Sequence, residues 1–380
     1  MKKVSIVLPT YNGEQYIKES IDSVLKQTYE NWELLIVDDC STDNTARIIQ
    51  EYARKDSRIM VIRNEVNQKL PGALNTGFRA ASGEYYTWTS DDNMYDDDAI
   101  ELMVDFLEKN PEYGMVYYNI RRLDENGNFS MGDDALEPQY LYTGSYIGAC
   151  FMYRREVAET VGEYDPDMFL VEDYDYWLRI SKRYKLHFIP QCKYTYRVHS
   201  ASLSTTRIGQ FQVQAYRIRL RELDYLLEKI DNDEKEILFL TMWANRKKQT
   251  WDLREKFFPD GILPERLKWI EQRACTEETI ASDQQLIFFG AGEFGQKALK
   301  YFGRDRVRCF VDNNPNLAGT EIEGIPVVSF ADLMEIREPC QILITVGRRF
   351  VSEIANQLEA AGLTEYTLFL GNYERLVSAG

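Results

Sequence analysis

Two pairs of adjacent acidic residues each follow an apolar run, and they are the residues in this chain best suited to chemistry. The first pair is Asp38-Asp39 and the second is Asp91-Asp92. Neighbouring carboxylates repel each other and are costly to bury, and a bound cation or polar ligand offsets that cost. The two pairs therefore predict a ligand site, and a divalent metal is the ligand that they suit best.

A glycine-rich loop in the last quarter of the chain is a second candidate site. Gly290, Gly292 and Gly295 follow an apolar run and precede a helical pattern, which is the context of a dinucleotide-binding fingerprint. Asp312 comes 20 residues after Gly292, where a ribose-binding acid belongs. The unit at 283–380 is short for a complete dinucleotide-binding fold and lacks a Tyr-x-x-x-Lys pair. Nucleotide binding and a structural or dimerising role are both open, and redox chemistry is disfavoured.

Alternating strand and helix signals in residues 1 to about 110 provide the elements that would position the acid pairs. Such alternation is typical of a parallel sheet covered by helices. Ligands of open α/β sheets bind at the carboxyl ends of the strands, so both acid pairs are expected to face one site. The predicted strands are 4–8, 34–37, 59–62 and 85–89, and Asn12 is predicted to cap the first helix.

The remaining sequence divides into three parts. Residues 111–205 show a mixed pattern, with strands near 115–120, 148–153 and 186–189 and a helix near 172–183. Residues 206–282 are charged and amphipathic, which predicts helices that pack on the first domain, mediate dimers or lie on a membrane surface; packing is favoured. The predicted domains are therefore 1–205, a helical connector at 206–282, and a second, Rossmann-like α/β domain at 283–380.

Bulk composition excludes several classes of protein. A net charge of −16 over 380 residues argues against electrostatic binding of nucleic acid. Six cysteines without a Cys-x-x-Cys pair indicate reduced thiols in a cytosolic protein, not disulfides or a zinc site. The first apolar run ends at Pro9, so it predicts a strand and not a signal peptide. No run approaches the roughly 20 apolar residues that a membrane span needs.

Several motifs, taken in order, carry a resemblance to a known family. Residues 1 to about 205, slightly more than half of the chain, resemble the nucleotide-sugar glycosyltransferases of family 2, which have the GT-A fold, a Rossmann-like mixed sheet. Each motif alone is weak, but the ordered set is specific. The motifs are Val4–Asn12, Val37–Asp43, Asn75-Thr76-Gly77 with Gly83-Glu84-Tyr85, Thr89–Asp92, Glu172-Asp173 ahead of Trp177-Leu178-Arg179, and Tyr196–Ser200.

The resemblance implies transfer of a sugar from a nucleoside diphosphate, most often UDP, to an acceptor hydroxyl, with inversion at the anomeric carbon. It assigns nucleotide recognition to Pro9, Thr10 and Tyr11, and to Asp39, which would accept a hydrogen bond from the uracil N–H. The acceptor would be a saccharide or a lipid-linked saccharide.

The same resemblance implies the catalytic roles. Asp91 would meet the ribose or the metal shell, Asp92 would bind the divalent cation, Asp173 would be the general base, and His199 would reach the diphosphate or the metal. Many relatives have a further Asp where this chain has Thr89 or Ser90 (a position of the same motif), so Asp91 and Asp92 could exchange roles.

The chemistry of the reaction is consistent with these residue types. A diphosphate leaving group needs a hard cation, and Mn²⁺ or Mg²⁺ suits carboxylate ligands. Mn²⁺ also accepts an imidazole ligand, which fits His199. The charges of Glu172 and Asp175 are expected to raise the pKa of Asp173 toward the range useful to a base. Lys69 could approach the diphosphate from its loop.

Simpler interpretations stay open for some of these residues. Asp38 is better explained as a helix N-terminal partner than as a ligand, whereas Asp39 is not. Lys69 as a solvated loop cation is slightly favoured, and His199 as an ordinary loop residue is an alternative. His187 is predicted to be structural.

The sequence therefore predicts a metal-dependent inverting glycosyltransferase of surface polysaccharide or glycolipid assembly. It would be cytoplasmic, with peripheral attachment to the inner face of the plasma membrane and homodimer formation as further possibilities. An NAD(P)-dependent sugar-nucleotide oxidoreductase or epimerase, and a noncatalytic sugar-nucleotide-binding scaffold, are the alternatives. The last unit resembles the small Rossmann-like domains attached to sugar-modifying enzymes, such as sugar acetyltransferases.

Overall fold

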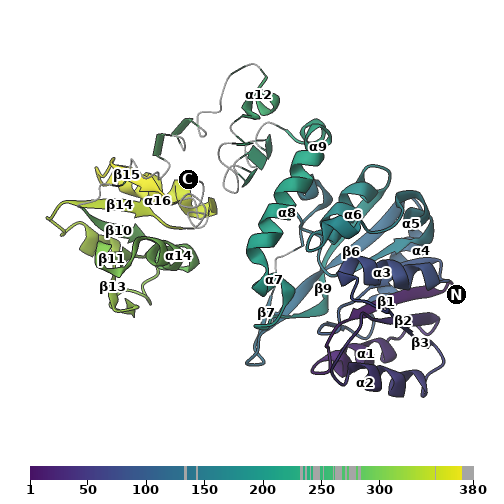
Figure 1. Cartoon of the computed structure of the whole chain (residues 1–380). Helices are drawn as coiled ribbons and strands as arrows, with labels where there is room; N and C mark the ends of the chain where they lie inside the picture. Colours follow the sequence, from purple (N-terminus) through teal and green to yellow (C-terminus); the bar gives the residue numbers. More distant parts are fainter. Residues whose placement is uncertain are drawn as a thin grey trace. The chain divides into compact units, whose positions relative to one another are not determined.

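A computed structural model shows the chain as two compact units, Met1–Leu238 and Phe239–Gly380 (Figure 1). The structure describes residues 1–131, 135–142, 144–231, 284–346 and 348–369. It also describes short segments between these ranges, namely 234–235, 238–239, 241–242, 249–250, 252–259, 261, 268–269, 272–273 and 280.

The first half of the sheet in the first unit is parallel, as the alternating pattern predicts. Strand β1 pairs with β2 on one side and β4 on the other, and β2 pairs with β3. The strands β1 and β2 are almost fully buried because helices cover the sheet. The elements are β1 Val4–Thr10, α1 Ile17–Leu25, β2 Trp32–Asp38, α2 Thr45–Ala53, β3 Ile59–Arg63, α3 Lys69–Ala80, β4 Tyr85–Trp88 and α4 Ala99–Lys109.

The second half of the sheet is mixed, which confirms the predicted GT-A type of fold. Strand β8 runs antiparallel to β4 and to β6, β9 runs parallel to β6, and β5 runs antiparallel to β9. The order is β3-β2-β1-β4-β8-β6-β9-β5, with β7 paired to β6. These elements are β5 Met94–Tyr95, β6 Tyr113–Leu123, β7 Phe129–Met131, η1 Pro138–Tyr142, β8 Cys150–Arg154, α5 Arg155–Val161, η2 Pro166–Met168, α6 Glu172–Ser181 and β9 Lys185–Arg197.

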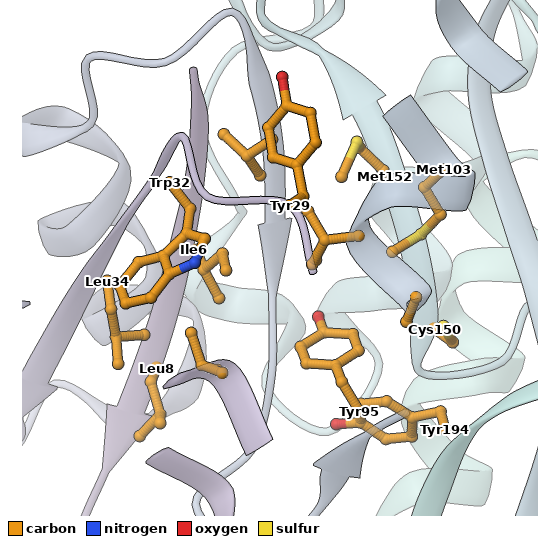
Figure 2. Packing of buried hydrophobic residues seen from close by; sticks show 14 of the residues in the cluster. Ile6, Leu8, Tyr29, Trp32, Leu34, Tyr95, Met103, Cys150, Met152 and Tyr194 are labelled. Atoms are coloured by element: carbon orange, nitrogen blue, oxygen red, sulfur yellow. The ribbon is translucent and has the colours of Figure 1, made fainter. Parts of the chain in front are cut away.

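Aromatic residues from strands distant in sequence meet in the core (Figure 2). The rings of Tyr95 and Tyr194 pack edge to face, with 4.9 Å between their centroids. Their hydroxyls share hydrogen bonds with threonine Oγ1 atoms: Tyr95 with Thr87 at 3.0 Å, and Tyr194 with Thr89 at 2.7 Å. These contacts attach the end of β4 to β5 and β9, so the segment 91–93 is anchored at both ends.

The helices after β9 belong to the first unit. They are α7 Leu203–Thr206, α8 Ile208–Arg221 and α9 Leu223–Lys229, and all three precede the division of the chain at Leu238. Within the predicted connector, the second unit contains α12, Arg254–Phe257. Much of 232–283 lies outside the described residues, so the predicted boundaries at 205 and 282 stay predictions. No helix in the described ranges is long and apolar enough to cross a membrane.

The second unit contains a parallel sheet of the Rossmann-like type that the sequence predicts. Its order is β12-β13-β11-β10-β14-β15, and the pairs are parallel except β12 with β13. The order of the strands along the sheet reverses at β10, because β11 lies on one side of β10 and β14 on the other. The elements are β10 Gln285–Phe289, α14 Glu293–Phe302, η3 Arg304–Arg306, β11 Val307–Val311, β12 Glu321–Ile322, β13 Ile325–Val328, α15 Phe330–Leu333, β14 Cys340–Ile344, α16 Arg348–Ala360 and β15 Tyr366–Leu368.

The predicted cap of the first helix is wrong. Helix α1 begins at Ile17, after Tyr16, and no side chain caps it. Asn12 instead adopts a left-handed conformation (φ 56°), and its Oδ1 accepts a hydrogen bond from the Thr42 N–H at 2.8 Å. Asn12 therefore connects the loop after β1 to the loop after β2.

Candidate active site

The carboxyl ends of β1 and β4 bring Thr10 next to Asp91. Thr10 Oγ1 donates a hydrogen bond to Asp91 Oδ2 at 2.5 Å. A Cβ at Gly13 would lie 2.2 Å from that same oxygen, so only glycine fits beside this pair. Sequence reasoning missed Gly13; its signal is an Asn-Gly step directly after a strand. Burial and the nearby charge of Asp92 raise the pKa of Asp91 to about 7.

Asp39 lies at the carboxyl end of β2 with one oxygen engaged. Its Oδ1 accepts hydrogen bonds from Asn64 Nδ2 at 2.8 Å and from the Gln68 N–H at 2.9 Å. Its own N–H donates to the Thr10 carbonyl at 2.9 Å, which holds the residue beside β1. Both side-chain bonds go to Oδ1, so Oδ2 is the oxygen that faces no donor among the described residues. Asp39 can therefore accept one more hydrogen bond.

Asp38 has a structural environment, but it is not the helix N-terminal partner that the sequence favours, because α2 begins only at Thr45. Its Oδ2 forms an ion pair with Arg63 at 2.7 Å, and its Oδ1 accepts from the Ser41 N–H at 2.9 Å. The side chain is 1% exposed. The pair Asp38-Asp39 thus divides into one residue that holds the loop and one that is free to bind.

The second acid pair meets the predicted histidine. His199 Nε2 lies 3.0 Å from Asp92 Oδ2, although the two residues are 107 positions apart. Asp92 Oδ1 is buried and has no hydrogen-bond partner. A buried oxygen without a partner is costly, and a hard cation would satisfy it. Carboxylate and imidazole are both ligands that Mn²⁺ accepts, so these two residues fit such a metal.

The number of protein ligands at this position is small. No group of three or more His, Cys, Asp or Glu residues with the spacing of a metal site occurs among the described residues. A cation held by Asp92 and His199 would therefore need further oxygen ligands from the donor or from water.

The predicted base is in the first turn of α6. Asp173 Oδ1 accepts a hydrogen bond from the Tyr174 N–H at 2.6 Å, and burial raises the pKa of Asp173 to about 6. Glu172 is 4% exposed, and its Oε2 has no partner. Burial, and then the charge of Asp173, raise the pKa of Glu172 above its usual range.

The expectation that the charge of Asp175 raises the pKa of Asp173 is wrong. Asp175 is 1% exposed and forms ion pairs with Arg179 at 2.8 Å and with Arg221 of α8. Two guanidinium groups balance its charge, and burial is what raises the pKa of Asp173. Helix α8 is instead attached to α6 through this carboxylate.

Three aromatic residues connect α6, which carries Asp173, to the end of β4. Trp88 Nε1, at the end of β4, donates to the Tyr164 hydroxyl at 3.1 Å, and Tyr164 stacks on Tyr176 of α6 at 4.0 Å. Burial raises the pKa of Tyr164, and the negative charge of Asp173 adds to that effect. Asp173 makes no hydrogen bond to Asp92 in the part of the chain that the structure describes.

Lys69 begins α3 in a left-handed conformation (φ 61°). Its Nζ lies 5.2 Å from the centroid of the Phe169 ring, three residues before Glu172. The side chain is exposed. The loop cation is therefore close to the segment that leads into α6, and its contact with a diphosphate stays a prediction.

Comparison with known proteins decides the family. The model of glycosyl transferase family 2 matches residues 5–162. An uncharacterised glycosyltransferase of Haemophilus influenzae is 30% identical over 249 residues, which are 62% of this chain and 77% of that protein. The UDP-Glc:alpha-D-GlcNAc-diphosphoundecaprenol beta-1,3-glucosyltransferase WfgD of Escherichia coli is 31% identical over 243 residues, 62% of this chain and 90% of that protein.

The chain belongs to glycosyltransferase family 2. It is a glycosyltransferase, and the oxidoreductase alternative has no support. The segment matched by the family 2 model contains both acid pairs, whereas Asp173 and His199 lie beyond it. The fold agrees with that of the mannosyltransferase PcManGT from Pyrobaculum calidifontis, solved with GDP-Man and Mn²⁺ (TM-score 0.51, 19% identity, 71% of this chain and 79% of that one).

The second unit matches the model of a CoA binding domain over residues 281–369. Gly290 has a positive φ of 119°, and a Cβ at Gly295 would lie 2.1 Å from the Gly290 carbonyl oxygen, so both glycines are required by close packing. Gly292 has no atom within 4 Å of its Cβ position. Asp312 Oδ2 accepts from the Ala291 N–H at 2.9 Å, so this carboxylate closes the glycine-rich loop.

Proposed function

We propose that this family 2 enzyme is metal-dependent and transfers a sugar from a UDP-sugar to an acceptor hydroxyl with inversion. The observation that carries the proposal is the Asp92–His199 contact, with Asp92 Oδ1 buried and unpartnered. Thr10 and Asp91 lie on the same edge of the sheet. The Mn²⁺ in the complex of PcManGT supports the choice of metal for this chain.

The donor's base would bind at the ends of β1 and β2. Asp39 Oδ2 would accept the uracil N–H, because Oδ1 is already engaged. Tyr11 is 53% exposed directly after β1 and offers a ring on which the base can stack. Pro9 and Thr10 would line the edge of this base-binding position. Thr10 also donates a hydrogen bond to Asp91.

The diphosphate would lie beside Asp92 and His199. A divalent cation bound there supplies positive charge that stabilises the departing diphosphate. Asp92 and His199 would hold this cation, and Asp91 would orient the ribose or the outer shell of the metal. Lys69 would add a second positive charge from the start of α3.

The acceptor hydroxyl would be activated by Asp173. In a direct displacement the acceptor oxygen forms a bond to the anomeric carbon while the bond from that carbon to the diphosphate oxygen breaks. The hydroxyl proton passes to Asp173, whose raised pKa makes it a better base than an ordinary carboxylate. Glu172 would remain protonated beside it, and its Oε2, which has no hydrogen-bond partner, would be available to a polar group.

The acceptor would be a saccharide, either free or lipid-linked, in the assembly of a surface polysaccharide or glycolipid. The E. coli relative is named for a lipid diphosphate acceptor, and that supports the lipid-linked choice here. Such an acceptor would place this enzyme at the inner face of the plasma membrane.

The second unit would bind a nucleotide at the end of β10. The space around Gly292 would admit a phosphate beside the start of α14, at the position where strand order reverses between β10 and β14. Gly290 and Gly295 would shape that loop, and Asp312 would hold it closed, with its remaining lone pairs available to a ribose.

The decisive experiment is a screen of UDP-, GDP- and TDP-sugars for hydrolysis in the presence and absence of Mn²⁺. We expect Mn²⁺-dependent release of UDP. Asp173→Asn should reduce turnover by about 10²- to 10⁴-fold and leave UDP binding intact. Hydrolysis that is equal with Mn²⁺ and with a chelator would refute the metal requirement, and preference for a GDP- or TDP-sugar would refute the choice of base.

A further inference from the structure

Arg197, the last residue of β9, contacts the segment that carries Asp92 at two points. Its side-chain Nε–H donates to the Asp92 carbonyl oxygen at 3.1 Å. Its backbone N–H donates to Asn93 Oδ1 at 2.8 Å, and Asn93 is 1% exposed. The end of β9 therefore fixes the main chain of Asp92 and the side chain of the next residue.

The other face of Arg197 contacts helix α1 and the residue before it. Arg197 Nη2 forms an ion pair with Glu19 Oε2 at 2.8 Å, and its guanidinium carbon lies 4.4 Å from the centroid of the Tyr16 ring. The His199 ring packs on the same Tyr16, with 5.1 Å between centroids. The Arg197 side chain is 12% exposed, whereas that of Glu19 is 55% exposed, so Arg197 is largely buried and its ion pair reaches solvent on the Glu19 side.

We propose that Arg197 is a positioning residue that fixes the Asp92 carboxylate against the His199 ring, an inference that rests on the proposed metal site. Asp92 Oδ2 and His199 Nε2 are 3.0 Å apart, and the two residues come from different strands' ends. Arg197 holds the backbone of Asp92, and it shares Tyr16 with His199.

The chemistry of arginine explains why this residue type is needed. Its planar guanidinium can donate to the Asp92 carbonyl and to Glu19 at once while it stacks on Tyr16. Lysine would keep the positive charge near Glu19 but lacks the second fixed donor. Residues that orient metal ligands typically alter metal affinity by 10- to 100-fold when they are removed.

The test is Mn²⁺ binding by the full chain in the presence of UDP, measured from the electron paramagnetic resonance signal of free Mn²⁺. We expect Arg197→Gln to raise the Mn²⁺ Kd by about 10- to 100-fold. Arg197→Lys should raise the Kd by about tenfold or more while the Tm stays near that of the wild type. Lys193→Gln is the matched control: Lys193 lies on the same strand as Arg197, and the substitution removes its 2.7 Å ion pair with Asp98, the residue before α4. The Kd of this variant should stay within about twofold of the wild type.

The outcomes distinguish a failure of the positioning role of Arg197 from a failure of the proposed metal site. Mn²⁺ binding by Arg197→Lys within about twofold of the wild type would overturn the positioning role and leave the metal site in place. The same holds if Arg197→Gln lowers the Tm without a change in Kd, since that is the signature of a purely structural residue. A wild-type chain that binds no Mn²⁺ with UDP would refute the proposed metal site and the positioning role with it.

Discussion

The pH dependence of transfer is the most direct test of Asp173 as the base. Burial raises the pKa of Asp173 to about 6, and a base works only in its ionised form. With saturating metal, kcat/KM should be level above pH 7 and should fall on the acid side. The expected rate is about tenfold below the plateau at pH 5 and about a hundredfold below it at pH 4.

The assay is the initial rate of UDP release between pH 4 and 8 at constant ionic strength, with a return to pH 7 to show that no activity was lost irreversibly. Glu172→Gln is the informative control. Because burial is the main cause of the raised pKa of Asp173, and burial persists in this variant, it should keep the acid limb near pH 6.

Two results would contradict the assignment of Asp173 as the base. A limb near pH 4 would mean that Asp173 has the pKa of an ordinary exposed carboxyl. A limb near pH 6 that persists in Asp173→Asn would assign the titration to another group, and Asp91 is the candidate because its pKa is raised to about 7.

Four further predictions concern packing and charge. Gly13→Ala should abolish UDP binding measured by calorimetry, because its Cβ would lie 2.2 Å from Asp91 Oδ2. Asp175→Asn should lower the free energy of unfolding, measured by urea denaturation, by about 2 kcal/mol. This loss is smaller than that for breaking a fully buried ion pair, because both arginine partners reach solvent. Burial raises the pKa of Glu172 in the folded state, so the stability that its neutral form contributes is present at low pH and is lost as the pH rises through that raised pKa. The Tm of the wild type should therefore fall relative to that of Glu172→Gln between pH 5 and 9. Gly292→Ala should leave the Tm unchanged whereas Gly295→Ala should lower it, since the first Cβ meets no atom within 4 Å and the second lies 2.1 Å from a carbonyl oxygen; equal effects would contradict this packing.

Local sequence pattern predicts the strands and the edge of the sheet well, and it predicts the helix start poorly. The apolar runs before Asp38 and Asp91 are buried strands because only a sheet covered on both faces hides such runs. Asn12 looks like a helix cap, yet it adopts φ 56° because its side chain bonds to Thr42 of a different loop. A cap signal is local, and a partner 30 residues away overrides it.

The family, the order of the acid motifs and the two α/β units are readable from the sequence, because they follow from residue types and spacings along the chain. Which acids have partners depends on contacts between residues that are distant in the sequence. Arg63 pairs with Asp38, whereas Asp39 can still accept a hydrogen bond. Arg179 and Arg221 balance the charge of Asp175, and burial is the main cause of the raised pKa of Asp173. The family resemblance implied that Asp92 and His199 share a site, but their direct contact depends on strands that meet across the sheet. The contacts of Arg197 around them have no signature in the local sequence.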